Sequence, residues 1–430
     1  MRILFVNQFF YPDTSATSQL LTDLAVDLAA AGHEISVLTS NAEYHGGRET
    51  LAAREVYRSV IIRRVFCGRF DRESPLRRAS SYLRFLFGVG VRLFRRRPPD
   101  VVFVLTTPPL VALLPALLQT WRGVPYVCWV QDVYPEVAVA VGAIAPTSRA
   151  VRLAAGLNGY IYASAAAVVA LGSCMERLLR DTGVSPKKLH VIHNWADGQA
   201  IRPTARRANP FLRGLGVRDE FVVLYSGNLG RGHEFETLTG AMLELRASPA
   251  IRFMVIGDGA RLSEVTEFVR KWGLTNVSFL PPQPRADLSL TLSAGDVGIV
   301  STRSGCEGTM VASKIYGLLA AGRPYIYIGP VATTMAEVAE VHQCGWHIAE
   351  GDIAGLCRLL QSLRRQPELV AAAGLNARAA LEAVFDRPHG VRQFEMLLSR
   401  VAGRIPRLAA ADESPTSPIV HAKIAAAGRG

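Results

Sequence analysis

Residues 301–328 read STRSGCEGTMVASKIYGLLAAGRPYIYI, in which a glycine-broken loop precedes a run of small and apolar residues and then a strand pattern. A helix that begins near Ser313 would direct unpaired backbone N–H groups and the positive end of its dipole at an anion. The ammonium group of Lys314 follows at once. This stretch therefore predicts a site for a diphosphate.

A second glycine-rich turn, YSGNLGRG at residues 225–232, comes directly after the apolar run 221–224. A short apolar run bounded by turn residues is typical of a buried strand. The turn that follows it would reach the same phosphates from another side. Two loops around one anion indicate a nucleotide-activated substrate.

Strand and helix patterns alternate along the chain on both sides of a polar, proline-containing linker at residues 194–218. Such alternation predicts an α/β fold with parallel sheets. We expect two doubly wound Rossmann-like domains that face each other across a cleft, with ligands at the carboxyl ends of the strands. The expected divisions are residues 1–200, residues 201–385, a C-terminal helix at 386–403 that returns to the first domain, and a disordered tail at 404–430.

Composition is that of an ordinary globular protein, since the 430 residues are 49% apolar and 20% charged. Six scattered cysteines form no CxxC pair, so they indicate neither a zinc site nor a disulfide framework and favour a reducing cytoplasm. The first apolar run is too short for a signal peptide. The uncharged segment 101–121 is as long as a membrane span, but Pro108, Pro109 and Pro115 interrupt it, which favours a strand, a loop and a buried helix.

Positive charge is concentrated at residues 54–97, which hold 13 Arg and no Lys against Glu55, Asp71 and Glu73. Apolar residues at helical spacing run through the same segment, from Tyr82 to Leu93. Such a helix either packs on the core with solvated arginines or lies on an anionic membrane surface, where each basic residue contributes roughly 1 kcal/mol. We favour the membrane, and expect no nucleic acid because no aromatic and basic interleaving of an RNA-binding type occurs.

Five segments occur in a specific order, namely YSGNLGRGHEFETL, VIGDGARLSEV, FLPPQPRADLSLTLSAGDVGIV, GCEGTMVASKIYGLLAAGRPYI and CGWHIAEGD. Together they resemble the retaining glycosyltransferases of family 4, which have the GT-B fold, and specifically the branch of colanic-acid and other exopolysaccharide sugar transferases. The segments NQFFYPDTSATSQL and WVQDVYPEVAVAVG are also similar to that branch. The resemblance implies an acceptor-binding first domain and a nucleotide-sugar-binding second domain.

The resemblance also implies a donor site without a metal or cofactor, in which a UDP- or GDP-sugar is the co-substrate. Arg231 and Lys314 would neutralise the charge that develops on the leaving diphosphate, and Glu307 would contact the donor sugar. Further donor contacts would come from Gly227, Asn228, Gly230, Gly257, Gly259, Pro282, Gln283 and Ser313.

Three positions depart from the family's pattern. Gly317 stands five residues before Gly322, where most members carry the glutamate that holds the ribose, and Glu307 lies two residues further upstream than usual. Ala312 replaces the proline that relatives tend to have before Ser-Lys. The ribose contact is therefore unassigned.

On the acceptor side, a turn offers hydroxyl groups that either face the cleft or only cap the next helix, those of Thr14, Ser15, Thr17 and Ser18. Asp132 follows the apolar run 126–130 and is expected to position the acceptor or to handle its proton. His193 is either a packing residue between the domains or a cleft residue. His233 either contacts an anion or packs its loop.

The predicted activity is transfer of a hexose-type sugar, with retention of configuration, from a nucleotide-diphosphate donor to a glycan or polyprenyl diphosphate-linked acceptor. It would serve exopolysaccharide, capsule or O-antigen biosynthesis at the inner face of the plasma membrane. Two alternatives remain open. Nucleotide-sugar epimerases use the same frame and would consume donor without acceptor, and a catalytically silent binding protein would fit Gly317.

Overall fold

The computed structural model describes residues 1–44, 51–68, 70, 74–95 and 97–403. The expected tail at 404–430 lies outside the described residues, as do Arg69, Asp71, Arg72, Glu73 and Arg96 of the basic segment.

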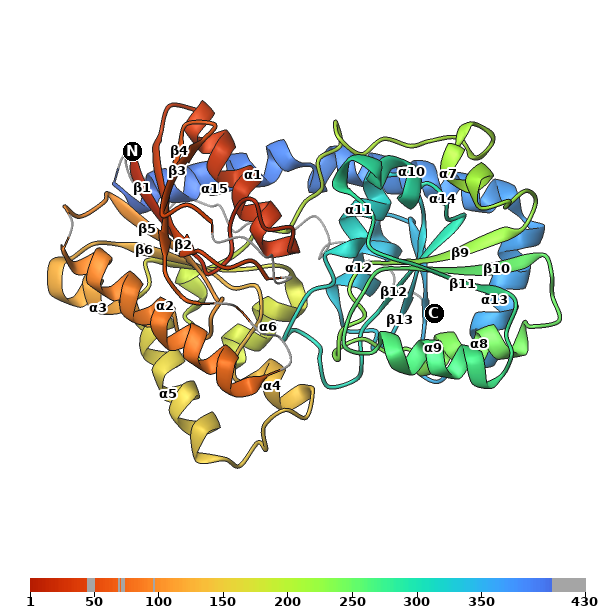
Figure 1. Cartoon of the computed structure of the whole chain (residues 1–430), viewed down its shortest axis with the longest axis horizontal. Helices are drawn as coiled ribbons and strands as arrows, with labels where there is room; N and C mark the ends of the chain where they lie inside the picture. The colour runs from red at the N-terminus through yellow and green to blue at the C-terminus, as the bar shows by residue number, and fades with distance from the viewer. Residues whose placement is uncertain (45–50, 69, 71–73, 96, 404–430) are drawn as a thin grey trace, which may run out of the picture.

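Eight strands form one sheet, which with its helices is the N-terminal domain (Figure 1). Their order is β3-β4-β2-β1-β5-β6-β7-β8, and only the β3–β4 pair is antiparallel. The strands are β1 (Arg2–Val6), β2 (Glu34–Ser40), β3 (Arg54–Tyr57), β4 (Val60–Val65), β5 (Val101–Leu105), β6 (Tyr126–Trp129), β7 (Ala167–Ala170) and β8 (Leu189–Val191). Every residue of β5 and β6 is buried, because helices cover both faces of a parallel sheet. The helices are α1 (Ala16–Ala30), α2 (Pro75–Arg95), α3 (Leu113–Arg122), α4 (Glu136–Ala140), α5 (Arg149–Ser164) and α6 (Ser173–Asp181).

Six parallel strands form the second sheet, in the order β11-β10-β9-β12-β13-β14, and with their helices they are the C-terminal domain. The strands are β9 (Phe221–Ser226), β10 (Ile251–Ile256), β11 (Val277–Leu280), β12 (Val297–Ser301), β13 (Tyr325–Ile328) and β14 (Gly345–Ile348). The helices are α7 (Pro210–Gly214), α8 (Glu236–Glu244), α9 (Leu262–Lys271), α10 (Leu288–Leu292), α11 (Lys314–Ala320), α12 (Thr334–Val341), α13 (Ile353–Arg365) and α14 (Pro367–Ala380).

Strand order reverses once in each sheet, between β1 and β5 and between β9 and β12. Loops that leave such a point in opposite directions open a crevice at the carboxyl ends of the strands. The turn 225–232 begins in the last two residues of β9 and continues beyond it, and the loop 302–313 follows β12. The topology therefore brings the two segments with the strongest sequence signal to one crevice, and the expectation of two doubly wound sheets is confirmed.

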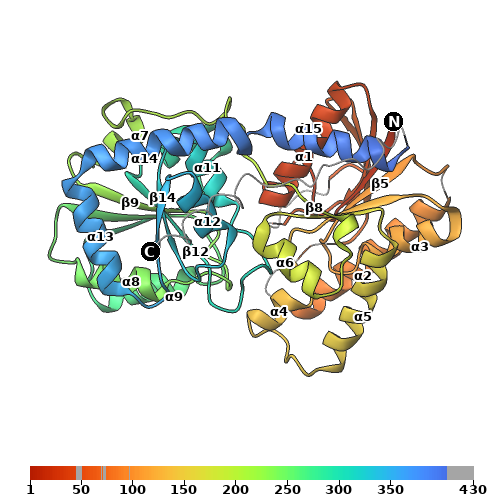
Figure 2. The same cartoon turned by 180° about the vertical axis from the view of Figure 1, so that it is seen from behind.

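Two crossings of the chain join the domains, and they lie side by side. Ala196 and Asp386 form a parallel bridge between the linker and the start of α15 (Arg387–Val401). Figure 2 shows α14 and α15 following one another along one edge of the molecule, from the C-terminal to the N-terminal domain. Phe394 of α15 packs against Trp129 of β6, with ring centroids 4.8 Å apart.

The basic segment 54–97 is not a single charged surface. Arg64 lies in β4, its side chain is fully buried, and it pairs with Glu55 at 2.7 Å. Helix α2 buries Phe85, Val89 and Leu93 against the core, whereas other apolar side chains of the helix are exposed. This helix therefore packs through one face and leaves apolar and basic residues on the other.

Within the described ranges, no helix has both the length and the apolar character that crossing a bilayer requires. Residues 101–121 divide into β5 and α3, with Pro108 and Pro109 in the loop between them, as expected.

Candidate active site

Lys314 joins the two glycine-rich segments. Its Nζ donates hydrogen bonds to the Tyr225 hydroxyl at 2.5 Å and to the Asn228 carbonyl at 3.4 Å, and lies 3.9 Å from the centre of the Tyr225 ring. Helix α11 begins at Lys314 and has only seven residues. The charge at this point therefore comes mainly from the side chain and not from the helix dipole.

Lys314 is half-buried, and its partial loss of hydration makes the cation easy to neutralise. Desolvation lowers the pKa of Lys314 to about 7, because surroundings of low polarity disfavour the charged form. Its hydrogen-bond partners in the described structure are neutral oxygens and no carboxylate. An anion bound here would supply the counter-charge and raise the pKa again.

Glycines let the turn at residues 227–230 and the turn at residues 257–259 lie directly on each other. These two segments are called the glycine turns below. Gly257 has φ +149°, and a Cβ placed on it would lie 2.0 Å from the Gly227 carbonyl oxygen. A Cβ on Gly259 would lie 2.5 Å from the Leu229 carbonyl oxygen. The Leu229 N–H also donates to the Asp258 carbonyl at 2.9 Å. This packing leaves the backbone of both loops open to a close ligand.

Other predicted donor residues lie in the same loops. Arg231 is exposed and Glu307 is half-buried, and neither makes a hydrogen bond or ion pair with another described residue. Ser313 precedes α11 but its hydroxyl makes no capping bond. A Cβ on Gly230 would lie 2.9 Å from Nδ2 of Asn228. The structure joins none of these side chains directly to Lys314, although the Asn228 carbonyl contacts it.

The loop that follows β11 completes this side of the crevice. The Gly257 N–H donates to the carbonyl of Leu280, the last residue of β11, at 3.1 Å, so this loop leaves the sheet next to the turn at Gly257. Pro282 is exposed, and Gln283 donates from Nε2 to the Pro281 carbonyl at 2.7 Å.

Gly317 faces α10, where a Cβ placed on it would lie 3.1 Å from Cδ1 of Leu292. A larger side chain at Gly317 would therefore need Leu292 to move. The structure assigns no replacement for a ribose-holding glutamate.

Both candidate histidines pack as neutral rings. The Ser301 carbonyl accepts from Nδ1 of His233 at 2.6 Å, and burial with nearby Lys314 lowers the pKa of His233 to about 3. The Leu171 carbonyl accepts from Nδ1 of His193 at 2.9 Å, and burial lowers the pKa of His193 to about 4. The bond to Ser301 fits the loop-packing role that was one of the two alternatives for His233.

Asp132 meets the C-terminal domain across the crevice. It forms an isolated antiparallel bridge with Met310, and the next N–H, of Val133, donates to the Thr309 carbonyl at 2.8 Å. Burial raises the pKa of Asp132 to about 6. The Thr106 hydroxyl accepts from the N–H of Asp132 at 3.3 Å. A carboxyl group with this pKa can exchange a proton near neutral pH.

Asp13 organises the predicted acceptor turn. Its contacts correct the expectation that Ser18 faces the crevice and the expectation that Ser15 caps α1. Ser18 is fully buried and donates to the Asp13 carbonyl at 3.0 Å, so its hydroxyl does not face the crevice. Ser15 donates to the Asp13 carboxylate at 2.5 Å and makes no capping bond to α1. Thr14 is exposed and Thr17 is half-buried, so these two remain candidates for the acceptor.

Sequence reasoning missed three residues of the crevice. Tyr225 supports Lys314, Thr106 supports the Asp132 loop, and Asp13 holds the acceptor turn. Tyr225 lies near the end of β9, Thr106 directly follows β5, and Asp13 lies in the loop between β1 and α1. Their positions after predicted strands could have identified them, because ligands bind at the carboxyl ends of the strands in such sheets.

Comparisons with known proteins agree with this geometry. Residues 17–195 match the family described as glycosyl transferase 4-like domain, and residues 213–380 match glycosyl transferases group 1. WbjE of Pseudomonas aeruginosa, named as a probable glycosyltransferase, is 30% identical over 302 residues, which are 69% of this chain and 75% of WbjE. WcaI of Escherichia coli (strain K12), named for glycosyl transfer in colanic acid biosynthesis, is 23% identical over 411 residues, which are 92% of this chain and 98% of WcaI.

Solved structures share the fold at lower identity. Sucrose-phosphate synthase from Thermosynechococcus elongatus has a TM-score of 0.76 at 17% identity and covers 94% of this chain and 100% of its own. HepE from Anabaena, in complex with UDP and glucose, has a TM-score of 0.70 at 18% identity, with coverage of 93% and 99%. These likenesses confirm the GT-B fold. The chain therefore belongs to the GT-B glycosyltransferases that combine a glycosyl transferase 4-like domain with a group 1 domain.

Proposed function

We propose that this glycosyltransferase moves a hexose-type sugar from a UDP- or GDP-sugar to a lipid-linked glycan, with retention of configuration, in exopolysaccharide or lipopolysaccharide biosynthesis. The observation that carries the proposal is Lys314, a desolvated cation without a carboxylate partner beside two stacked glycine turns. A diphosphate supplies the missing charge. The names and ligands of the relatives support the substrate classes, since HepE is described in complex with UDP and glucose, and the name of WcaI refers to colanic acid biosynthesis.

In the proposed donor complex, the diphosphate lies against Lys314 and the turns at Gly227 and Gly257. Arg231 has no ion-pair partner among the described residues and supplies a second cation. Preorganised cations stabilise charge on the leaving group more strongly than water can, because they do not need to reorient during the reaction. Glu307 contacts the sugar from the loop after β12.

The proposed transfer occurs on one face of the sugar. The bond from C1 to the diphosphate oxygen breaks, and the acceptor oxygen bonds to C1 on the same side. The acceptor proton passes to the leaving diphosphate oxygen. Asp132 orients the acceptor hydroxyl from the opposite domain, together with Thr14 and Thr17.

Proton NMR of the anomeric signal tests this mechanism directly. The first product formed by the purified enzyme should keep the anomeric configuration of the donor. Lys314→Ala should lower kcat/KM by about 100-fold to 1,000-fold, as loss of one preorganised charge contact does. An inverted product, or full activity of Lys314→Ala, would contradict the proposal, and donor consumption without acceptor would indicate an epimerase.

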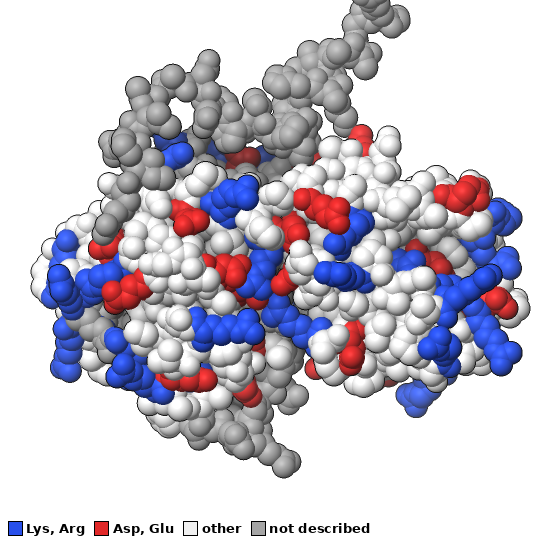
Figure 3. Space-filling model, turned by 90° about the horizontal axis from the view of Figure 1, so that it is seen from above, with Lys and Arg blue, Asp and Glu red and all other residues white. Residues whose placement is uncertain are grey.

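We further propose that the outer face of α2 rests on an anionic membrane surface. Leu76, Leu83 and Phe87 are 85%, 68% and 77% exposed. Arg77, Arg84 and Arg95 of the same helix are exposed beside them. Figure 3 shows a different face of the molecule, seen from above relative to Figure 1. On that face basic and acidic side chains are interspersed over both domains.

The neighbouring helix α3 extends this apolar and basic face. Trp121 of α3 is 65% exposed, its ring centroid lies 5.6 Å from that of Phe94 on α2, and Arg122 stacks over it at 4.3 Å. Apolar side chains among arginines suit the boundary between lipid headgroups and acyl chains.

Flotation with phosphatidylglycerol vesicles tests the docking. Leu83→Ser together with Phe87→Ser should release the protein, and Arg84→Ser alone should weaken binding by about fivefold, which is roughly 1 kcal/mol. Arg364→Ser with Arg365→Ser, at the exposed end of α13, is the matched charge control and should leave binding unchanged. Equal flotation of all variants would overturn the docking proposal.

A further inference from the structure

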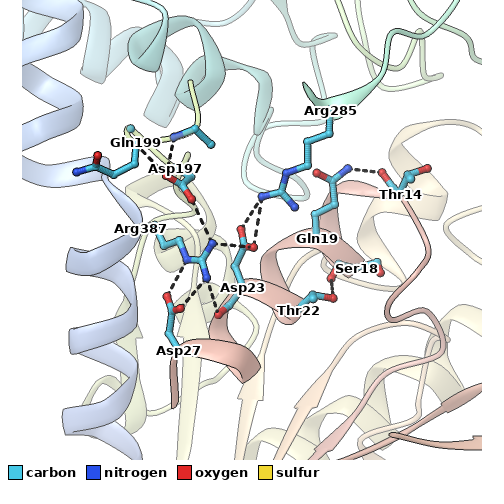
Figure 4. Close-up of polar contacts among 12 residues, drawn as sticks. Thr14, Ser18, Gln19, Thr22, Asp23, Asp27, Asp197, Gln199, Arg285 and Arg387 are labelled. Carbon is cyan, nitrogen blue, oxygen red and sulfur yellow. Dashed lines mark hydrogen bonds and ion pairs between the residues drawn. The ribbon is translucent and has the colours of Figure 1, made fainter. Parts of the chain in front are cut away.

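A cluster of charges lies where the two domains meet (Figure 4). Arg387 at the start of α15 contacts three carboxylates, with Asp27 at 2.6 Å, Asp23 at 3.0 Å and Asp197 at 3.2 Å. Asp23 and Asp27 belong to α1, and Asp197 belongs to the linker next to the chain crossing at Ala196. Arg387 therefore fixes both chain crossings to the N-terminal domain.

Arg285 joins the same cluster from the C-terminal domain. Its Nη2 donates to both carboxylate oxygens of Asp23, at 3.0 and 3.3 Å. Among the ion pairs of the described residues, this pair alone connects residues 213–380 with residues 1–195. The other polar contacts between the domains in the described structure are not ion pairs: the Val133 N–H donates to the Thr309 carbonyl, Ser173 donates to Glu337, and Arg177 donates to the Ala332 carbonyl at 3.1 Å.

The two arginines differ in how firmly they are held. The Arg387 side chain is 17% exposed and reaches three carboxylates, whereas the Arg285 side chain is 47% exposed and reaches one. Asp23 is 11% exposed and keeps Arg387 when Arg285 leaves. The Arg285 contact can therefore break and reform without leaving a buried charge unpaired.

Arg285 also lies at the end of the loop that follows β11, directly after Pro284. The strand β11 that leads into this loop is tied at its last residue, Leu280, to the Gly257 N–H, and Asp23 lies on the helix that follows the acceptor turn. The pair thus spans the crevice between the donor side and the acceptor side.

We infer that Arg285 is a positioning residue that, through Asp23, holds the loop at residues 281–284 and the N-terminal domain in the closed arrangement. The inference rests on the proposed function for the identity of the donor. Arg285 itself touches no reacting atom. Its loss leaves the chemistry intact and weakens closure, so the KM for the donor rises while kcat at saturation stays within about twofold.

Distances between spin labels in the two domains test the closure independently of activity. Exposed positions Thr147→Cys and Ala247→Cys carry the labels. Arg285→Gln should broaden the distance distribution, with and without UDP, and Arg285→Lys should restore part of it. Arg252→Gln is the matched control, because Arg252 pairs with Glu220 inside the C-terminal domain and is 29% exposed.

Donor kinetics complete the test. Arg285→Gln should raise the donor KM by up to about fivefold, the effect of one partly exposed ion pair, and Arg252→Gln should not. Unchanged distances and KM for Arg285→Gln, in a protein that binds UDP, would overturn the inference. Absence of nucleotide binding by the wild-type protein would instead overturn the proposed function.

Discussion

At the scale of single residues, Lys314 combines two properties that oppose each other. Burial lowers its pKa to about 7, but a diphosphate is attracted only by the protonated form. The free energy needed to protonate such an amine becomes small once an anion binds, because the anion stabilises the ammonium form in place of the lost water. Tyr225 beneath it supplies a hydroxyl and a ring face, both of which favour the ammonium form.

The first prediction concerns pH. Desolvation lowers the pKa of Lys314 to about 7 in the free protein, whereas the negative charge of a bound diphosphate would raise that pKa. Affinity for UDP should therefore be highest near pH 7 and fall roughly fivefold from pH 7 to pH 8, where the terminal phosphate is already ionised. Calorimetric titration across this range measures the change.

Lys314→Arg provides the control for pH, because arginine stays charged throughout. Its UDP affinity should be nearly constant from pH 7 to 9. A wild-type affinity that does not change over the same range would show that Lys314 does not supply the charge.

The second prediction concerns the stacked glycines. Gly257→Ala forces a Cβ against the Gly227 carbonyl oxygen at a φ of +149°, so the donor turns must separate. UDP affinity should fall by more than about tenfold, since a shift of 1 Å in a positioning loop costs about that much or more. Gly273→Ala, at φ +59° with open space around it, should cost only about 1 kcal/mol of stability and leave UDP affinity unchanged.

Residue roles could be predicted only in part. Lys314 and the glycines can be recognised as site residues in the sequence, because their residue types suit phosphate binding and they follow apolar runs that predict strands. Ser18 and Ser15 carried the same kind of signal, but their hydroxyls are used by Asp13. Which partner satisfies a hydroxyl is decided by the folded turn and is not visible in the spacing.

At the scale of elements, α2 shows why an amphipathic pattern has two interpretations. The apolar residues of this helix exceed what one buried face can hold, so Phe85 packs inside while Phe87 lies outside. The pattern predicted the helix correctly. It left open which apolar stripe faces the core, because packing against β4 decides that.

The third prediction tests this packing with two glycines of α2. A Cβ on Gly88 would lie 2.1 Å from Cγ1 of Val65, so Gly88→Ala should push α2 away from β4 and destabilise the protein by about 1–3 kcal/mol. A Cβ on Gly90 meets Leu114 at an ordinary 3.6 Å. Gly90→Ala should be neutral or stabilise by up to about 1 kcal/mol, because alanine favours helices.

Thermal unfolding of both variants measures the difference. Gly88→Ala should have the lower melting temperature of the pair. The packing described for α2 would be contradicted if the order were reversed.

At the scale of the whole molecule, strand and helix alternation was sufficient to predict two doubly wound sheets. The observed strand order reverses between β9 and β12, which places the loops after these two strands at the same crevice. The pair of Arg285 and Asp23 could not be predicted, because residues 262 positions apart meet only when the domains take their relative orientation. Contacts between domains depend on that orientation and leave no periodic signal.

The central claim is that Lys314 and the two glycine turns bind the diphosphate of a nucleotide sugar. Calorimetric titration of UDP and GDP into the wild-type protein and Lys314→Ala tests it most directly, with Lys271→Ala as control because Lys271 is exposed and also lies over an aromatic ring. One nucleotide should bind, and Lys314→Ala should weaken it by about 10-fold to 100-fold, the effect of one charge-assisted hydrogen bond, while Lys271→Ala should not. Equal affinity of the wild-type protein and Lys314→Ala for that nucleotide would contradict the claim.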